Sequence, residues 1–234
     1  MSKSEGPFTF GDRAFRFYTS LVTPRVPRGV AVMNPYMEPS VRGCLRKYLD
    51  KYFSDNRERV LILGINPGRF GAGVTGVTFA DPVALADYCG IPNELPRRRE
   101  LSSVFVYDVV NALGGPSEFH SRFFLSAVCP LGFTQDGVNL NYYDDRKLER
   151  AVTPFIVSSV EQHIALGGRR DHVVILGRGE NSKFFTRLND HHRWFGSIHS
   201  LDHPRFIMQY RRKKLDAYIE KYRTVLSSVS HGLG

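Results

Sequence analysis

Apolar residues gather in four short runs that have the length of buried β-strands. The runs cover residues 60–65, 123–128, 172–176 and 194–201, and Gly196 interrupts the last of them. A continuous apolar run of this length, bounded by turn residues, is typical of a strand that is covered on both faces. The pattern therefore predicts four strands of one buried sheet.

Helical spacing of apolar residues separates these strands. The expected helices cover about residues 40–53, 102–113, 145–166 and 180–188, and a last helix starts near residue 207. Strands that alternate with helices indicate a parallel sheet with helices on both faces. We therefore expect an α/β fold with three α/β/α layers around a central four-stranded, mostly parallel sheet.

The two ends of the chain carry weaker patterns. Residues 1–39 are expected to be an irregular N-terminal segment with at most a short helix near residues 15–18, and residues 228–234 a disordered tail. No repeat or low-complexity linker divides the sequence, and 234 residues can bury a full core. Residues 1–234 are therefore expected to form a single domain.

Composition adds a strong positive charge to this picture. Lysine and arginine exceed aspartate and glutamate by 32 to 23, which gives a formal net charge of +9 and a pI near 9.6. This charge suits a polyanion such as nucleic acid, although many basic proteins bind none.

Cysteine usage and hydropathy indicate the compartment. The three cysteines, Cys44, Cys89 and Cys129, lack metal-ligand spacing, which argues against a zinc or iron–sulfur site, and a sparse, odd number suits a reducing compartment. The sequence has neither an apolar run of about 18 residues nor a signal-peptide pattern. We expect an intracellular protein, in the cytoplasm or nucleoid of a bacterium or the nucleus of a eukaryote, with no membrane contact.

The most informative segment follows the first predicted strand. There the apolar run breaks into a glycine-rich turn, residues 64–71, that carries a lone amide, Asn66. In an open α/β sheet, ligands bind beyond the carboxyl ends of the strands. The other predicted strands end near Ser126, Arg178 and His203, so these side chains are expected to share one cleft. No Lys-Ser/Thr pair follows the glycines, which makes a nucleotide P-loop a poor match.

These residues resemble a known family. Gly64-Ile65-Asn66-Pro67-Gly68-Arg69-Phe70-Gly71, continued by Thr75-Gly76-Val77-Thr78-Phe79, resembles motif one of the single-strand-selective monofunctional uracil-DNA glycosylases, the SMUG branch of the uracil-DNA glycosylase superfamily. The further matching segments are Asn34-Pro35-Tyr36, Glu100-Leu101-Ser102, Cys129-Pro130-Leu131, Gly137-Val138-Asn139-Leu140, Gly177-Arg178 and, as the second motif, His203-Pro204. Motif one is specific, a bare His-Pro is not, and the ordered set spans roughly residues 34–222.

The resemblance implies the chemistry and its residues. Asn66 matches the asparagine that positions the hydrolytic water, and His203 the histidine that stabilises charge on the departing base. Phe79 matches the aromatic ring that stacks on the flipped base, and Gly68 the glycine that leaves space beside C5 of the pyrimidine. Such a glycosylase hydrolyses the N-glycosidic bond of uracil in single- or double-stranded DNA, leaves an abasic site, and uses no cofactor or metal. We expect it to act as a monomer.

One departure from the family concerns base recognition. The asparagine that reads uracil in the family aligns with Ala127, and Ser126 replaces a neighbouring polar residue. Losing a bidentate contact of this kind costs roughly 1–3 kcal/mol of discrimination. We therefore expect a permissive pocket that accepts uracil and other deaminated bases such as xanthine. Ser126 and groups near Ile65 and Ala127 are expected to bind the base.

A second departure follows His203-Pro204, where the family inserts a wedge into the DNA. This chain has a different sequence there, and six of its side chains are candidates for the wedge and for DNA binding: Arg205, Phe206, Gln209, Tyr210, Arg211 and Arg212. Apolar wedges and arginines both fill the gap that a flipped base leaves. The basic run 211–214 is expected to track phosphates.

Other interpretations of the same residues remain open. The protein is alternatively a nucleic-acid-binding module of this fold without catalysis, or an enzyme acting on a free nucleoside or nucleotide. The histidines at 191, 192, 199 and 203 have no spacing that fixes metal geometry, so a structural or surface role is favoured. Asp81, Asp144 and Asp145 stand where helix N-caps are expected rather than catalytic carboxylates.

Overall fold

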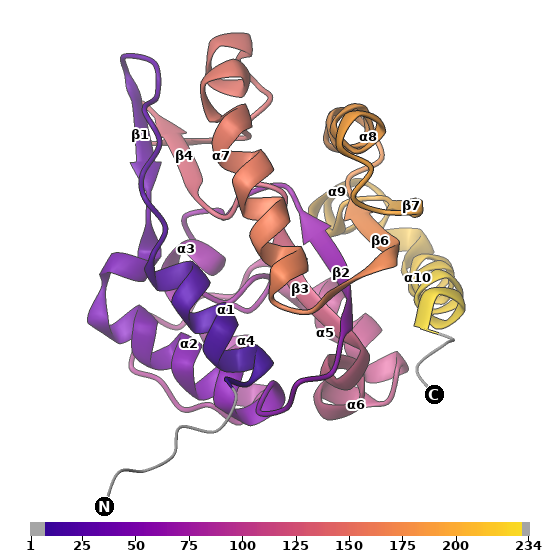
Figure 1. The fold of residues 1–234 in the computed structure, drawn as a ribbon. Helices are drawn as coiled ribbons and strands as arrows, with labels where there is room; N and C mark the ends of the chain where they lie inside the picture. The colour runs from indigo at the N-terminus through magenta and orange to yellow at the C-terminus, as the bar shows by residue number, and fades with distance from the viewer. Residues whose placement is uncertain (1–7, 231–234) are drawn as a thin grey trace, which may run out of the picture.

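A four-stranded parallel sheet lies between layers of helices (Figure 1). The structure is a computed structural model and describes residues 8–230. The strand order is β3 (Phe123–Ala127), β2 (Arg59–Gly64), β6 (Gly168–Leu176) and β7 (Ser197–Leu201), and each neighbouring pair is parallel. This confirms the predicted α/β class and the central parallel sheet.

The register brings the carboxyl ends of the strands to one edge of the sheet. Gly64 pairs with Ala127 at the ends of β2 and β3, and Leu176 pairs with Leu201 at the ends of β6 and β7. The fourth strand starts later than predicted. Phe195 belongs instead to a turn in which both its backbone N–H and its carbonyl bind the side chain of Asn189.

Helices cover both faces of the sheet. In Figure 1, α1 (Phe10–Thr19) and α7 (Arg146–Ala165) lie on one side of it, and α5 (Leu101–Ala112) and α10 (Leu215–Ser230) lie on the other. The remaining helical segments are α2 (Pro39–Tyr52), α3 (Ala72–Thr75), α4 (Pro82–Asp87), α6 (Gly115–Arg122), α8 (Glu180–His192), α9 (Pro204–Tyr210), and the 3-10 turns η1 (Pro35–Met37) and η2 (Arg212–Lys214). The predicted helices at 40–53, 102–113, 145–166 and 180–188 are confirmed.

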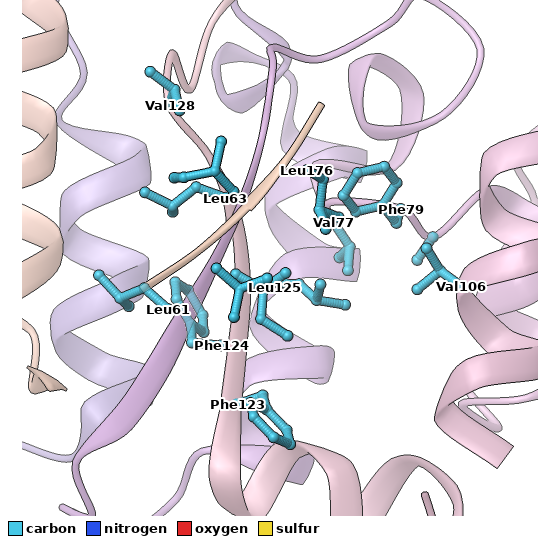
Figure 2. Packing of buried hydrophobic residues seen from close by; sticks show 14 of the residues in the cluster. Leu61, Leu63, Val77, Phe79, Val106, Phe123, Phe124, Leu125, Val128 and Leu176 are labelled. Atoms are coloured by element: carbon cyan, nitrogen blue, oxygen red, sulfur yellow. The ribbon is translucent and has the colours of Figure 1, made fainter. Parts of the chain in front are cut away.

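Side chains of β2 and β3 alternate between the two faces of the sheet. Leu61 and Leu63 of β2 and Phe124 of β3 lie on the α1 and α7 side (Figure 2). Leu125 of β3 lies on the opposite side, where Phe79 also packs. All five are buried. This alternation follows from the two-residue period of a strand, and it decides which residues at the strand ends can reach a ligand.

The N-terminal segment, which was predicted to be irregular with at most a short helix, contains both a helix and a strand within residues 8–39. Its helix α1 begins at a capping box, in which the Thr9 hydroxyl accepts from the Asp12 N–H while the Asp12 carboxylate accepts from Thr9. A second, antiparallel sheet then joins β1 (Val30–Met33) to β4 (Gly132–Gln135) and β5 (Val138–Leu140). The pairing of β1 with β4 joins segments about one hundred residues apart, which local patterns do not reveal. The pairing of β4 with β5 is a local hairpin, and its Asp136-Gly137 turn is a signal that the sequence did contain.

The C-terminal region also differs from expectation. The helix expected from residue 207 is two helices, α9 and α10, with η2 between them. Helix α10 continues to Ser230, so residues 228–230 of the expected tail are helical, and residues 231–234 lie outside the described part of the chain. None of the helices within residues 8–230 combines the length and the apolar character that a membrane crossing needs.

Two of the three predicted aspartate caps are confirmed. Asp81 accepts a hydrogen bond from the Ala84 N–H at the start of α4, and Asp145 accepts from Lys147 and Leu148 at the start of α7. Asp144 instead closes the preceding turn through the backbone N–H and side chain of Asn141.

Candidate active site

A cavity of about 530 Å³ opens at the carboxyl edge of the sheet. Its walls come from the turn after β2, the end of β3, the start of α5, the end of β5 and helix α9. Asn66, Phe79, Ala127 and His203 all line it. The structure thus brings together residues that lie far apart in the sequence.

Asn66 lies two residues after β2, and its carboxamide is held by the end of β5 and the chain that follows it. Its Oδ1 accepts a hydrogen bond from the Tyr142 N–H at 3.1 Å, and its Nδ2 donates to the Leu140 carbonyl at 3.1 Å. The opposite chemistry of these two partners fixes which end of the amide is the oxygen. Oδ1 keeps a second acceptor position. The side chain is therefore held at the cavity mainly by a distant segment, and its Nδ2 makes only a longer contact of 3.5 Å with the Pro67 carbonyl of its own turn.

His203 is the N-cap of α9, and its Nδ1 accepts a hydrogen bond from the Arg205 N–H at 3.2 Å. A ring nitrogen that accepts carries no proton, so the neutral ring carries its proton on Nε2. Burial, and then the positive charge of Arg205, lower the pKa of His203 to about 4. The imidazole is consequently neutral at physiological pH and presents one N–H donor.

Phe79 connects the core to the cavity. It has a φ of 58° and is 9 % exposed, and its ring centroid lies 5.9 Å from that of His203. Gly64 makes room for this ring, because a Cβ there would lie 2.9 Å from the Phe79 Cζ. Ser103 holds the turn by donating to the Phe79 carbonyl at 2.7 Å. Phe79 therefore packs in the core and offers an aromatic surface to the cavity as well.

The structure corrects the expectation for Ser126. Neighbouring residues of β3 point to opposite faces, so Ala127 lines the cavity and Ser126 does not. The Ser126 hydroxyl is buried between the Tyr18 hydroxyl at 2.8 Å and the His163 Nε2 at 2.7 Å. It belongs to the contact between β3, α1 and α7.

Ile65 and Gly68 line the cavity beside Asn66. The Ile65 carbonyl already accepts a hydrogen bond from the Cys129 N–H at 3.0 Å, so this carbonyl acts first in holding the two strand ends together. A Cβ at Gly68 would lie 3.5 Å from the Asn139 Nδ2 and 3.6 Å from the Glu100 Oε1. These are ordinary contact distances, so the absence of a side chain at Gly68 leaves usable space in the cavity.

Helix α9 forms the outer rim. Arg205, Phe206, Gln209 and Tyr210 line the main cavity, and a shallower hollow continues from Gln209 to Lys214, including Arg211 and Arg212. Phe206 is 37 % and Tyr210 65 % exposed, and their ring centroids are 5.5 Å apart. Large exposed aromatic side chains beside a basic segment are unusual unless they meet a partner.

Other residues of the cavity received no role from the sequence. Glu100, Thr78, Ser102, Asn139 and Asn141 also line it. Glu100 and Asn139 occur in segments that carry the family resemblance, and this resemblance is the signal in the sequence that points to them. Neither residue lies at the end of a predicted strand, so the strand pattern does not indicate them.

The remaining histidines do not join this cavity. His199 contacts His172 through ring nitrogens 3.2 Å apart, and His192 stacks on Trp194 with ring centroids 4.4 Å apart. Residues 8–230 contain no group of three or more His, Cys, Asp or Glu side chains placed to hold a metal ion.

Comparisons with known proteins identify the family of the chain. Residues 51–227 match the sequence model of the Uracil DNA glycosylase superfamily. The single-strand selective monofunctional uracil-DNA glycosylase of Rattus norvegicus is 33% identical in an alignment of 117 positions, which covers 42% of this chain and 42% of the rat protein. The corresponding Mus musculus protein is 32% identical over 105 residues, 38% of this chain and 37% of its own length. The aligned parts thus span only about two fifths of these relatives.

A solved structure matches nearly the whole chain. The crystal structure of wild-type Pedobacter heparinus SMUG2 superimposes with a TM-score of 0.93 and 39% identity, over 95% of this chain and 99% of that one. The fold is therefore shared over nearly the whole chain. A family model that matches most of the sequence, together with this common fold at 39% identity, makes this protein a SMUG-like member of the uracil DNA glycosylase superfamily.

Proposed function

We propose that the protein is a monofunctional DNA glycosylase that hydrolyses the N-glycosidic bond of uracil in DNA and leaves an abasic site. The observation that carries this proposal is the placement of Asn66 and His203 in one cavity. A rigid carboxamide and a neutral imidazole are the two groups that such a hydrolysis uses here. The membership of the superfamily supports the same reaction.

The reaction passes through a sugar with oxocarbenium character, so a strong nucleophile is unnecessary. Asn66 Oδ1 accepts a hydrogen bond from a water and holds it near the anomeric carbon. His203 Nε2 donates its proton as a hydrogen bond to an oxygen of the departing base, where negative charge develops. The neutral donor suits this task because it stabilises the anion without first needing to acquire a proton.

The base reaches the cavity by leaving the DNA stack, which costs a few kcal/mol. Phe79 offers a ring for stacking at the cavity, and Phe206 and Tyr210 stand at its rim as wedges that fill the gap in the DNA. The basic residues 211–214 follow directly and contact phosphates.

Basic side chains also stand near the motif-one side of the cavity. The Arg98 guanidinium lies 3.6 Å and that of Arg69 4.6 Å from the centroid of the Phe70 ring, two residues from the cavity-lining Gly68. We infer that the DNA backbone crosses the mouth between these arginines and η2, since both sides then neutralise phosphates.

The proposal also covers which damaged bases the cavity accepts. Ala127 presents only a methyl group where an amide would discriminate the edge of a pyrimidine, and Gly68 leaves further space in the same cavity. We propose that uracil is excised and that other deaminated bases, including xanthine, are accepted. Excision of uracil many thousandfold faster than xanthine would contradict this part.

The test uses oligonucleotides that carry one uracil, xanthine or hypoxanthine, in single-stranded and duplex form. We expect strand breaks only after alkali, because a monofunctional glycosylase leaves an intact abasic site. Binding without cleavage would favour a non-catalytic nucleic-acid module. Release of base from free deoxyuridine but not from DNA would favour a nucleoside enzyme.

A further inference from the structure

Glu100 supplies a carboxylate to the cavity. Among the described residues it is the only aspartate or glutamate in the cavity lining. It is the N-cap residue of α5, yet its side chain makes no capping hydrogen bond and reaches into the cavity instead. Its backbone is held in place, since the Glu100 N–H donates to the Asp81 Oδ2 at 2.7 Å.

One glycine of motif one, Gly71, makes room for this carboxylate. A Cβ at Gly71 would overlap the Glu100 Oε2, whereas a Cβ at Gly68 would lie at an ordinary contact distance of 3.6 Å from Oε1. Gly71 is therefore needed for the observed position of Glu100. The turn that carries Asn66 and the side chain of Glu100 fit together as one unit.

Hydrolysis releases a proton from the attacking water, and a basic group in the cavity assists the attack by accepting that proton. Asn66 has no basic atom at neutral pH. The titratable groups of the lining besides Glu100 are His203, Arg205 and Tyr210. Arginine and tyrosine side chains keep their protons at neutral pH, and the free electron pair of His203 Nδ1 is occupied by the Arg205 N–H.

We infer that Glu100 is the general base of the reaction, accepting the proton of the water that Asn66 orients. The inference rests on the proposed function. As the water oxygen bonds to the anomeric carbon, its proton passes to a Glu100 carboxylate oxygen, directly or through one further water. The C–N bond breaks, its electron pair leaves with the base, and the base anion takes a proton from solvent afterwards.

The electrostatic surroundings keep this carboxylate basic. Burial raises the pKa of Glu100, the nearby Asp81 carboxylate raises it further, and the Arg205 guanidinium lowers it. The neutral imidazole of His203 faces the same cavity. Only the ionised carboxylate accepts a proton, so the rate falls as the pH drops through this raised pKa.

The test is the Glu100→Gln variant, which keeps the shape of the side chain and removes its basicity. Glu38→Gln is the matched control, because Glu38 is the exposed N-cap residue of α2 and also makes no capping hydrogen bond. Uracil excision is measured in single turnover with the protein in excess, as a function of pH. Binding to uracil-free DNA and thermal unfolding are measured in parallel.

We expect Glu100→Gln to excise uracil about 10²- to 10⁴-fold more slowly than wild type. The decrease of its excision rate at low pH should depend on His203 alone. Its DNA binding and thermal unfolding should stay close to those of Glu38→Gln. A Glu100→Gln rate and pH profile equal to those of Glu38→Gln would overturn the inference and leave the proposed function intact. If the wild-type protein excises no base, the proposed function itself fails.

A second variant tests the same inference without altering Glu100. Gly71→Ala places a methyl group where the carboxylate now lies and pushes the flexible side chain away. We expect a slower excision in the wild-type background and no further loss when Gly71→Ala is added to Glu100→Gln. Equal losses in the two backgrounds would show that Gly71 acts independently of Glu100 and would contradict the inference.

Discussion

The backbone N–H of Arg205 donates to Nδ1 of His203 at 3.2 Å, and this contact determines which ring nitrogen faces the cavity with a proton. The donor lies two residues further along the same chain, at the start of α9, so the tautomer is set by local helix geometry. The Arg205 side chain adds a positive charge that opposes protonation of the ring. Burial is the main reason that His203 stays neutral, and Arg205 orients the ring and adds to that effect.

The pH dependence of excision follows from this contact. Since the pKa of His203 is lowered to about 4, its neutral form persists well below the ordinary histidine value near 6.5. We expect no loss of single-turnover rate centred on pH 6.5, and a loss of the His203 contribution as pH falls towards about 4. The clearest measurement uses Glu100→Gln, which lacks the second titrating group. A decrease of its excision rate centred near pH 6.5 would contradict the lowered pKa of His203.

Removal of the imidazole tests the same residue directly. We expect His203→Ala to lower the excision rate about 10²- to 10³-fold, the effect of losing one donor to a developing anion. His191→Ala, an exposed histidine of α8, is the control and should be unaffected. A fully active His203→Ala enzyme would remove the imidazole from the mechanism.

Asn66→Ala is expected to affect both catalysis and stability. It deletes the group that orients the water, and it leaves the Tyr142 N–H and the Leu140 carbonyl without their partner. We expect a strong loss of excision, together with a decrease of about 1–3 kcal/mol in the free energy of unfolding. Denaturant titration alongside the activity assay separates the two effects, and Asn111→Ala, on the exposed surface of α5, is the control.

Ala127→Asn should narrow the range of bases. Ala127 lines the cavity at the end of β3, and an asparagine there offers a donor and an acceptor to a pyrimidine. We expect the ratio of uracil to xanthine excision to increase by a factor that corresponds to roughly 1–3 kcal/mol. An unchanged ratio would mean that other groups read the base.

Two buried histidines predict how stability depends on pH. Burial lowers the pKa of His120 to about 3 and that of His163 to about 4, and both side chains are at most 1% exposed. The unfolded chain takes up protons near pH 6.5 while the folded chain does not, so stability is complete above that pH and decreases as the pH falls towards these values. Each histidine contributes a loss of about 2 kcal/mol at pH 5. Urea unfolding at pH 7 and pH 5 measures this, and equal free energies would refute it.

The basic segment after α9 predicts the salt dependence of DNA binding. If Arg212 and Lys213 each neutralise one phosphate, the combined Arg212→Ala and Lys213→Ala variant should reduce the slope of log affinity against log salt by about 0.9 for each lost contact on duplex DNA. Arg57→Ala is the control, because Arg57 precedes the amino end of β2, at the opposite edge of the sheet. An unchanged slope would place the DNA elsewhere.

Local sequence patterns determined much of the fold. Apolar runs and helical periods identified the four strands and the helices between them, because burial on both faces leaves a continuous apolar signature. Asn66 and His203 could be named in advance, since they follow strands and occur in recognisable segments. The place of β1 in the second sheet could not be named, because β1 pairs with β4, about one hundred residues away.

Tertiary structure decided the details of the cavity. The pleat of β3 directs Ala127 towards the cavity and Ser126 towards Tyr18 and His163. Adjacent residues of a strand always point to opposite faces, so an error of one residue assigns the wrong side chain to the cavity. The position of the Glu100 carboxylate depends on the packing of the start of α5 against the turn at Gly71. Side-chain direction and contacts between distant segments depend on how the helices and strands pack together. Local sequence patterns do not reveal that packing, so only the tertiary structure decides these contacts.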